Sequence, residues 1–86
     1  MNKTILITGA SSGIGKETAK LFQQKGWNVI ATMRKPEKET ELAQLENTLV
    51  TSLDVLDLGS IQHAVEEGLK MFGKIDVINN WNLRFT

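Results

Sequence analysis

The chain has 86 residues, with ten Lys or Arg and ten Asp or Glu, so its formal net charge is zero. Hydrophobic residues make up 41% and charged residues 23%, which is typical of one small globular domain and excludes a disordered chain. The absence of Cys excludes disulfides, thiol chemistry and Cys-based zinc sites. The balanced charge indicates no nucleic-acid or membrane partner. No apolar run approaches the roughly 20 residues of a membrane span, and we expect a cytoplasmic location.

The N-terminal third begins with an apolar, β-branched run at Thr4–Thr8, which is typical of a strand buried on both faces of a parallel sheet. A glycine-rich loop follows, and the pattern then predicts a helix over residues 14–25. This helix ends in a typical way, with a cation in its last turn and Gly26 just beyond it. We expect its apolar face to consist of Ile14, Thr18, Leu21 and Phe22.

The rest of the chain alternates between strands and helices. Strands are predicted over residues 28–32, 48–52 and 76–79. A proline suited to a first helical turn opens a polar helix predicted over residues 36–44. A last helix over residues 61–72 follows turn and cap residues and stops at a glycine. Its apolar face is expected to contain Ile61, Ala64, Val65, Leu69 and Phe72.

Four strands separated by three helices predict an α/β fold with a parallel sheet. Right-handed crossovers then favour a Rossmann-like, doubly wound sheet with the strand order 3-2-1-4. The first two helices should cover one face of this sheet, and the third helix should cover part of the other face.

The loop between the first strand and the first helix carries the strongest functional signal. Gly9 suits a tight exit from the strand, Gly13 leaves room for a pyrophosphate near the backbone, and Gly15 lets the helix pack closely on the sheet. The start of the helix offers N–H groups and a positive dipole to an anion. The plainer alternative is a glycine turn that merely starts a helix. As phosphate-binding residues we predict Gly9, Ser11, Ser12, Gly13, Ile14 and Gly15.

The glycine spacing is G-x-x-x-G-x-G, which differs from the common G-x-G-x-x-G dinucleotide fingerprint and from a triphosphatase loop. With the preceding Thr8, it resembles the T-G-x-x-x-G-I-G motif of the short-chain dehydrogenase/reductase family. The segment Leu53-Asp54-Val55, the run at residues 73–78 and the pair Asn79-Asn80 agree with that family. The resemblance covers residues 3–80, and we interpret residues 1–80 as the N-terminal part of an NAD(P)-binding Rossmann domain.

The resemblance implies further cofactor contacts. In the family the residue at Asp54 accepts a hydrogen bond from the adenine amino group, and the residue at Val55 lines the adenine pocket. Asn79 and Asn80 would support the cofactor through backbone and side-chain contacts. The alternative for Asp54 and for both asparagines is an ordinary turn residue.

The end of the second predicted strand favours NADP over NAD. An acidic residue there would bind the ribose 2′-OH, but this chain has Met33 followed by Arg34 and Lys35. The Arg34 guanidinium can pair with a 2′-phosphate through two hydrogen bonds. The alternative is a turn whose cations are simply solvated.

No catalytic residues and no metal site are predicted. Members of the family use a Ser and a Tyr and Lys spaced as Y-x-x-x-K, and the phenol acts as the general acid or base. This chain contains no Tyr, and its only histidine, His63, is expected on the surface of the last helix. We therefore expect the chain to represent the cofactor-binding part of an NAD(P)-dependent oxidoreductase, inactive in hydride transfer by itself. The alternatives are a non-enzymatic nucleotide-binding module and a flavodoxin-like or receiver domain.

Residues 81–86 do not continue the family's N-N-A-G motif. Synonymous codons for this tail can encode Gly-Ile-Tyr-Gly-Leu in another reading frame, so we hypothesise a frameshift. An unpaired fourth strand would form an apolar sheet edge, which predicts self-association.

Overall fold

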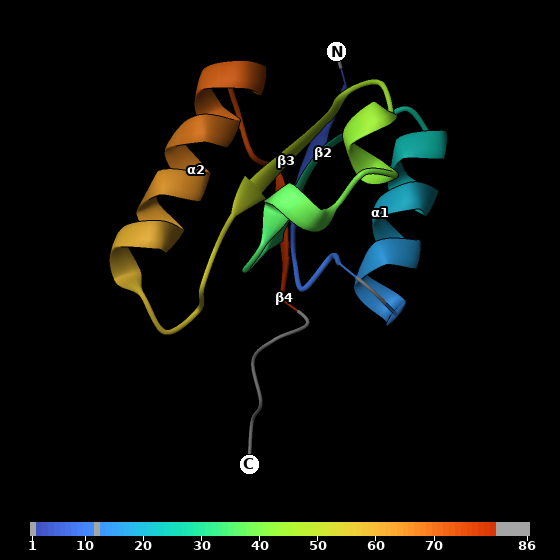
Figure 1. Cartoon of the computed structure of the whole chain (residues 1–86). Helices are drawn as coiled ribbons and strands as arrows, with labels where there is room; N and C mark the ends of the chain where they lie inside the picture. The colour runs from blue at the N-terminus through green and yellow to red at the C-terminus, as the bar shows by residue number, and fades with distance from the viewer. Residues whose placement is uncertain (1, 12, 81–86) are drawn as a thin grey trace.

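The computed structural model describes residues 2–11 and 13–80, and this part of the chain contains four β-strands and two α-helices (Figure 1). Their bounds are β1 Thr4–Thr8, α1 Gly13–Gln24, β2 Asn28–Met33, β3 Thr48–Ser52, α2 Leu58–Phe72 and β4 Val77–Asn80. The predictions made for Ser12 and for the tail at residues 81–86 lie outside the described residues.

The four strands form one parallel sheet in the order β3-β2-β1-β4, which confirms the predicted topology. In the register, Leu6 of β1 lies opposite Ile30 of β2 and Ile78 of β4. Because all strands run in the same direction, the loops that follow β1, β2 and β3 gather at one edge of the sheet. That edge is where open α/β sheets bind their ligands.

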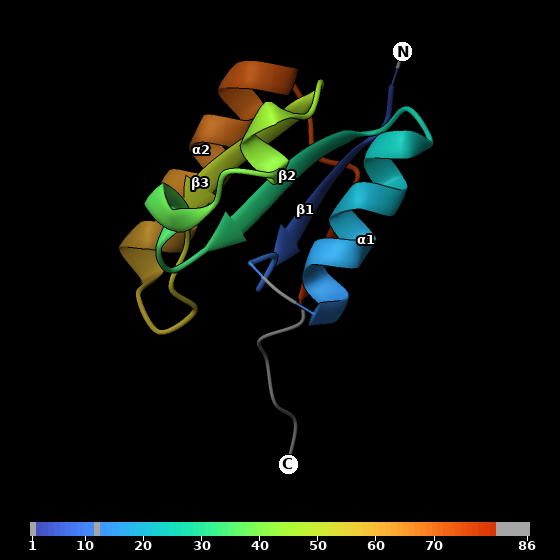
Figure 2. The same cartoon turned by 45° about the vertical axis from the view of Figure 1, so that its right-hand side comes forward.

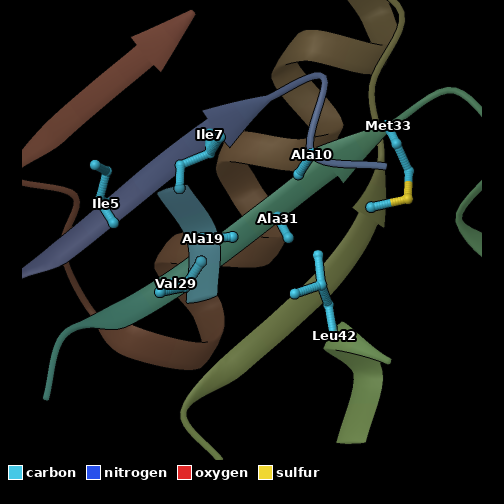
Figure 3. Packing of buried hydrophobic residues seen from close by; sticks show 8 residues of the cluster. All are labelled: Ile5, Ile7, Ala10, Ala19, Val29, Ala31, Met33 and Leu42. Atoms are coloured by element: carbon cyan, nitrogen blue, oxygen red, sulfur yellow. The ribbon is translucent and has the colours of Figure 1, made fainter. Parts of the chain in front are cut away.

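Side chains of β1 and β2 alternate between the two faces of the sheet, and both faces are covered. On the α1 face the buried cluster consists of Ile5, Ile7, Ala10, Ala19, Val29, Ala31, Met33 and Leu42 (Figure 3). On the α2 face it consists of Leu6, Ile30, Leu53 and Ala64. Burying each Ile, Leu or Val contributes roughly 1.5–3 kcal/mol, so the two central strands hold the fold together.

The face of α1 that packs on the sheet differs from the predicted one. Gly15 and Ala19 are buried and Phe22 is half-buried, whereas Ile14 is 66% and Leu21 49% exposed. The residues that face the sheet do follow the spacing i, i+4, i+7, but the series starts at Gly15 instead of Ile14. The small residues allow the helix to approach closely, and the two larger apolar side chains lie outside the contact.

The polar helix predicted over residues 36–44 is absent, and this prediction was wrong. Two short 3-10 turns, η1 Pro36–Lys38 and η2 Leu42–Gln44, replace it on the α1 side of the sheet (Figure 2). The chain between them is extended at Glu39, whose carboxylate accepts a hydrogen bond from the Leu42 N–H at 2.8 Å. The break lets Leu42 enter the core, so tertiary packing overrides the local helix preference.

The helix α2 begins about one turn earlier than predicted. The Asp57 carboxylate caps it by accepting hydrogen bonds from the N–H groups of Gly59 at 2.9 Å and Ser60 at 3.4 Å. Its C-terminus is closed by Gly73, whose φ of 82° lies in the left-handed region. The cap explains the earlier start, since Asp57 provides the acceptors that the first turn needs.

The outer edge of β4 is free of a partner strand within the described residues. Two side chains of β4 are exposed, with Val77 at 41% and Ile78 at 62%. Neither helix in the described part of the chain combines the length and the apolar character needed to cross a membrane.

Candidate functional site

A hollow of about 520 Å³ lies at the carboxyl edge of the sheet, and three loops line it. We call it the edge hollow. The loop after β1, the segment after β2 and the loop after β3 all contribute to it. Its lining residues are Gly9, Ser11, Met33, Arg34, Lys35, Lys38 and Val55.

The loop after β1 is fixed to the neighbouring strand β2. Gly9 turns the chain with a φ of 64°, a left-handed conformation that favours glycine. The next residue, Ala10, is fully buried, and its N–H donates to the Thr32 carbonyl at 3.0 Å. The Thr32 hydroxyl in turn donates to the Ile7 carbonyl at 2.7 Å. The wall of the edge hollow is therefore held by hydrogen bonds between β1 and β2.

The other two glycines of the motif meet different constraints. A Cβ on Gly15 would lie 2.2 Å from the Gly9 carbonyl oxygen, a distance that forbids any side chain. The predicted close approach at Gly15 is present, but its partner is the backbone of the loop after β1. Gly13 has a φ of 61°, and a Cβ built on it would meet nothing within 4 Å. Open space therefore lies beside the first turn of α1.

The predicted phosphate-binding side chains separate in space. Ser11 is exposed and lines the edge hollow. Gly13 and Ile14 lie instead beside a second depression of about 500 Å³ along α1, together with Thr18 and Leu21. The first turn of α1 contains no acidic residue, so no carboxylate there opposes an anion at the helix N-terminus.

Three cations line the edge hollow from residues 34–38, which we call the basic turn. Arg34 and Lys35 were predicted there, and both are exposed. The sequence analysis did not identify Lys38. It placed this residue in a regular helix, and the side of that helix that would face the hollow could not be inferred. The turn η1 brings it back to the same space. Within the described residues, no carboxylate lines this hollow.

Asp54 and Val55 follow β3 and have different environments. The Asp54 carboxylate accepts a hydrogen bond from the Leu56 N–H at 3.0 Å, and its own N–H donates to the Ser60 hydroxyl at 2.8 Å. It therefore has the turn role that the sequence analysis left open. Val55 lines both the edge hollow and a smaller apolar pocket of about 180 Å³ next to α2.

Asn79 and Asn80 end the strand β4 at the same edge of the sheet. In the register they lie opposite Ile7 and Thr8 of β1. They are thus on the far side of β1 from the basic turn, and Asn79 does not line the edge hollow. His63 is exposed on α2, as predicted.

The match to known proteins covers nearly the whole chain. The sequence model of the short chain dehydrogenase family matches residues 3–81. The chain is 41% identical over 83 residues to oxidoreductase BOA17 from Botryotinia fuckeliana, and 36% identical over 84 residues to sulfoacetaldehyde reductase 2 from Chromohalobacter salexigens. Each comparison covers 93% of this chain but only 30% and 33% of the relative. The chain thus spans about a third of the length of these relatives.

A solved structure agrees with the sequence match. It is the 3-ketoacyl-(acyl-carrier-protein) reductase from Brucella melitensis complexed with NADH, with a TM-score of 0.82 and 33% identity. The comparison covers 88% of this chain and 32% of that one. These findings exclude a flavodoxin-like or receiver domain and give no support to a non-enzymatic module. The chain belongs to the short-chain dehydrogenase family.

Proposed function

We propose that the chain binds the adenosine and diphosphate end of NADP(H), and that the complete enzyme transfers hydride between this cofactor and an alcohol or carbonyl. The observation that carries the proposal is the edge hollow. Glycine-loop residues, a basic turn and the apolar Val55 line one space, although they come from three separate loops. A dinucleotide offers matching chemistry, with a diphosphate, a 2′-phosphate and an adenine ring.

The described residues fit such a cofactor. The space beside Gly13 leaves the backbone open to a diphosphate, and the N–H groups of the first helical turn have no acceptors within the helix. Arg34 supplies a guanidinium that lines the neighbouring edge hollow. When bound, the nicotinamide supplies or accepts the hydride, while this chain holds the other end of the molecule.

We also propose that the chain prefers NADP to NAD. A 2′-phosphate needs a cationic partner, and Arg34, Lys35 and Lys38 all reach the edge hollow. The ribose 2′-OH of NAD is instead held by an acidic residue in dinucleotide folds, and Met33 occupies that place. The Brucella melitensis relative was solved with NADH, so family membership alone does not choose between the two.

The remaining predicted contacts belong to the same proposal. Val55 would pack on the adenine ring, and Asp54 would use the carboxylate oxygen that does not bind Leu56. Asn79 and Asn80 would contact the cofactor beyond its diphosphate, because they lie on the β4 side of β1. Ser12 is part of the proposed loop by its place in the motif.

We propose that the chain alone binds cofactor without transferring hydride. The family's general acid is a Tyr, and this chain has none. A spectrophotometric assay of NADPH oxidation with a panel of aldehydes and ketones checks this. Turnover above the rate without protein would contradict it.

Calorimetric titration of the chain with NADPH and NADH tests the cofactor proposal. We expect NADPH to bind at least about tenfold more tightly, because a charge-assisted pair with Arg34 is worth on the order of 1.5–3 kcal/mol. The variant Arg34→Asp should reverse this preference. As a control, Lys25→Asp makes the same change of charge at the opposite edge of the sheet and should leave the preference unchanged. Equal affinities in the unmodified chain would contradict the NADP assignment, and no binding would contradict the whole proposal.

Self-association and location complete the proposal. Val77 and Ile78 are exposed beside a free strand edge, which favours pairing with a second copy of the chain. Analytical ultracentrifugation of Ile78→Lys should show less dimer than the unmodified chain, and an unchanged distribution would contradict this.

Cell fractionation tests the proposed cytoplasmic location.

A further inference from the structure

A residue with a buried carboxylate, Glu39, follows the basic turn. The side chain of Glu39 is only 5% exposed, although it follows Lys38 immediately in the sequence. One of its oxygens accepts a hydrogen bond from the Leu42 N–H at 2.8 Å, and the other lies 3.4 Å from the Lys16 ammonium. A carboxylate this deeply buried needs such partners, since burial without them is costly.

The partner Lys16 belongs to α1 and lines the second depression along that helix. It follows Gly15 in the first turn of α1, so its ion pair with Glu39 connects the glycine loop to the end of the basic turn. Its ammonium also lies 3.0 Å from the Glu41 carboxylate. The pKa of Lys16 is raised above its ordinary value, first by the hydrogen bond with Glu41 and further by the charges of Glu39 and Glu41. The ammonium is therefore charged throughout the neutral range.

The basic turn itself has a compact backbone. The Lys38 N–H donates to the Lys35 carbonyl at 3.2 Å, and the Glu39 N–H donates to the Pro36 carbonyl at 3.0 Å. The segment also contains an exposed carboxylate, Glu37, and the carboxylate of Glu39 is paired outside the segment. Neither carboxylate lines the edge hollow, so the charged residues that line it in the described part of the chain are all cations.

We propose that Lys16 and Glu39 form a clasp that positions the basic turn for the 2′-phosphate and so sets the discrimination between NADPH and NADH. Both are positioning residues, since Arg34 and Lys38 make the contact with the phosphate. This inference rests on the proposed function. It goes beyond it by assigning selectivity to an ion pair outside the edge hollow.

The test measures the ratio of NADPH to NADH affinity in clasp variants of the chain. Lys16→Met removes the ion pair and keeps most of the aliphatic stem. We expect NADPH affinity to fall about tenfold and NADH affinity by less than about twofold, because only NADPH uses the basic turn. Lys16→Arg keeps the ion pair and should restore the ratio. A purely structural role would lower both affinities together.

Two further variants sharpen the test. Lys20→Met is the matched control, since it removes the same charge from the same helix face, while Lys20 pairs with Glu41 and Glu17 and not with Glu39. It should keep the NADPH preference. Glu39→Gln retains an acceptor for the Leu42 N–H and should lose the preference. Circular dichroism confirms that each variant is folded before titration.

The outcomes separate the inference from the proposed function. An unmodified chain that prefers NADPH, together with an unchanged ratio in Lys16→Met and Glu39→Gln, would overturn the clasp alone. If Lys20→Met lost as much of the NADPH preference as Lys16→Met, the clasp would also be overturned, since the change in overall charge would then explain the effect. No NADPH preference in the unmodified chain would contradict the proposed function, and the clasp with it.

Discussion

The two sides of strand β1 differ in how well they are covered. On the β2 side, the sheet continues to β3, and Ile30 at its centre is fully buried. On the other side, β4 forms the edge, and Ile78, which lies in the same register row, is 62% exposed. The basic turn and most of the edge hollow lie on the covered side. The part of the site that binds the adenosine end is thus built on the better-packed half of the sheet.

The two sides of the sheet are stabilised by different contacts. The β2 side is held by packing on two faces and by the clasp between α1 and the basic turn. The β4 side depends on its pairing with β1 and on the hydrogen bonds of Asp76 with Thr4. Substitutions of similar chemistry should therefore have different effects on the two sides.

Truncation of one isoleucine in β2 and one in β4 gives the largest expected difference in the free energy of unfolding. Ile30→Ala should lower the free energy of unfolding by about 4 kcal/mol, because it leaves a cavity in a fully packed core. Ile78→Ala should lower it by less than about 0.5 kcal/mol, because most of its side chain is already exposed. Urea denaturation followed by circular dichroism measures both. Equal losses in dilute solution would show that β4 is as well covered as β2.

A second contrast compares the two helix–sheet contacts. Gly15→Ala places a Cβ 2.2 Å from a backbone oxygen, and we expect a loss of about 3 kcal/mol. Gly68→Ala on α2 also meets an atom at 2.2 Å, but that atom is the Cδ1 at the end of the Ile30 side chain, which can shift where a backbone oxygen cannot. Alanine also favours a helix by up to about 1 kcal/mol over glycine, so Gly68→Ala should change stability by less than about 1 kcal/mol.

The same urea measurement decides this contrast. The expected result is a clearly lower midpoint for Gly15→Ala and nearly the unmodified midpoint for Gly68→Ala. A larger loss for Gly68→Ala would mean that the α2 contact is the more rigid of the two. An unchanged midpoint for Gly15→Ala would show that steric exclusion by the Gly9 carbonyl does not explain why residue 15 is a glycine.

The smallest expected effect concerns the edge of the sheet opposite the hollow. The hydrogen bond from the Thr4 N–H at 2.7 Å, helped by the charge of Lys74, lowers the pKa of Asp76 below its ordinary value of 3.8. A lowered pKa stabilises the native state above the ordinary value, and this stabilisation is lost as the pH falls through the lowered pKa. Asp76→Asn should therefore lower the urea midpoint slightly at pH 7.

The pH dependence provides the check on this prediction. The difference between Asp76→Asn and the unmodified chain should shrink as the pH falls below about 4, where the unmodified carboxyl takes up its proton. Glu66→Gln makes the same change of charge at an exposed position on α2 and serves as the control for the change in net charge. A difference that grows towards low pH would have the wrong sign for a lowered pKa.

The strands and their order could be predicted from the sequence because the signals are local. The run at Thr4–Thr8 and the crossover rule together fix a parallel sheet, and the structure confirms it. The covered face of α1 could not be found from apolar spacing, because Gly15 has no side chain to count. The close approach that places it there depends on the Gly9 carbonyl of a different segment.

The basic turn shows more clearly what could not be predicted from the sequence. A proline and a polar stretch favour a helix over residues 36–44, but the hydrogen bond between Glu39 and Leu42 and the ion pair with Lys16 break it. The ion pair joins residues distant in the sequence, so no local pattern announces it. Lys38 was missed for the same reason, whereas Arg34 directly follows β2 and could be identified.

Amide chemical-shift mapping during titration with NADPH tests the central claim most directly. We expect shifts at Gly9, Ser11, the basic turn and Val55, with none at Lys74 or Asp76 on the opposite edge. Shifts gathered around Lys74 and Asp76, or no shifts at saturating NADPH, would contradict it.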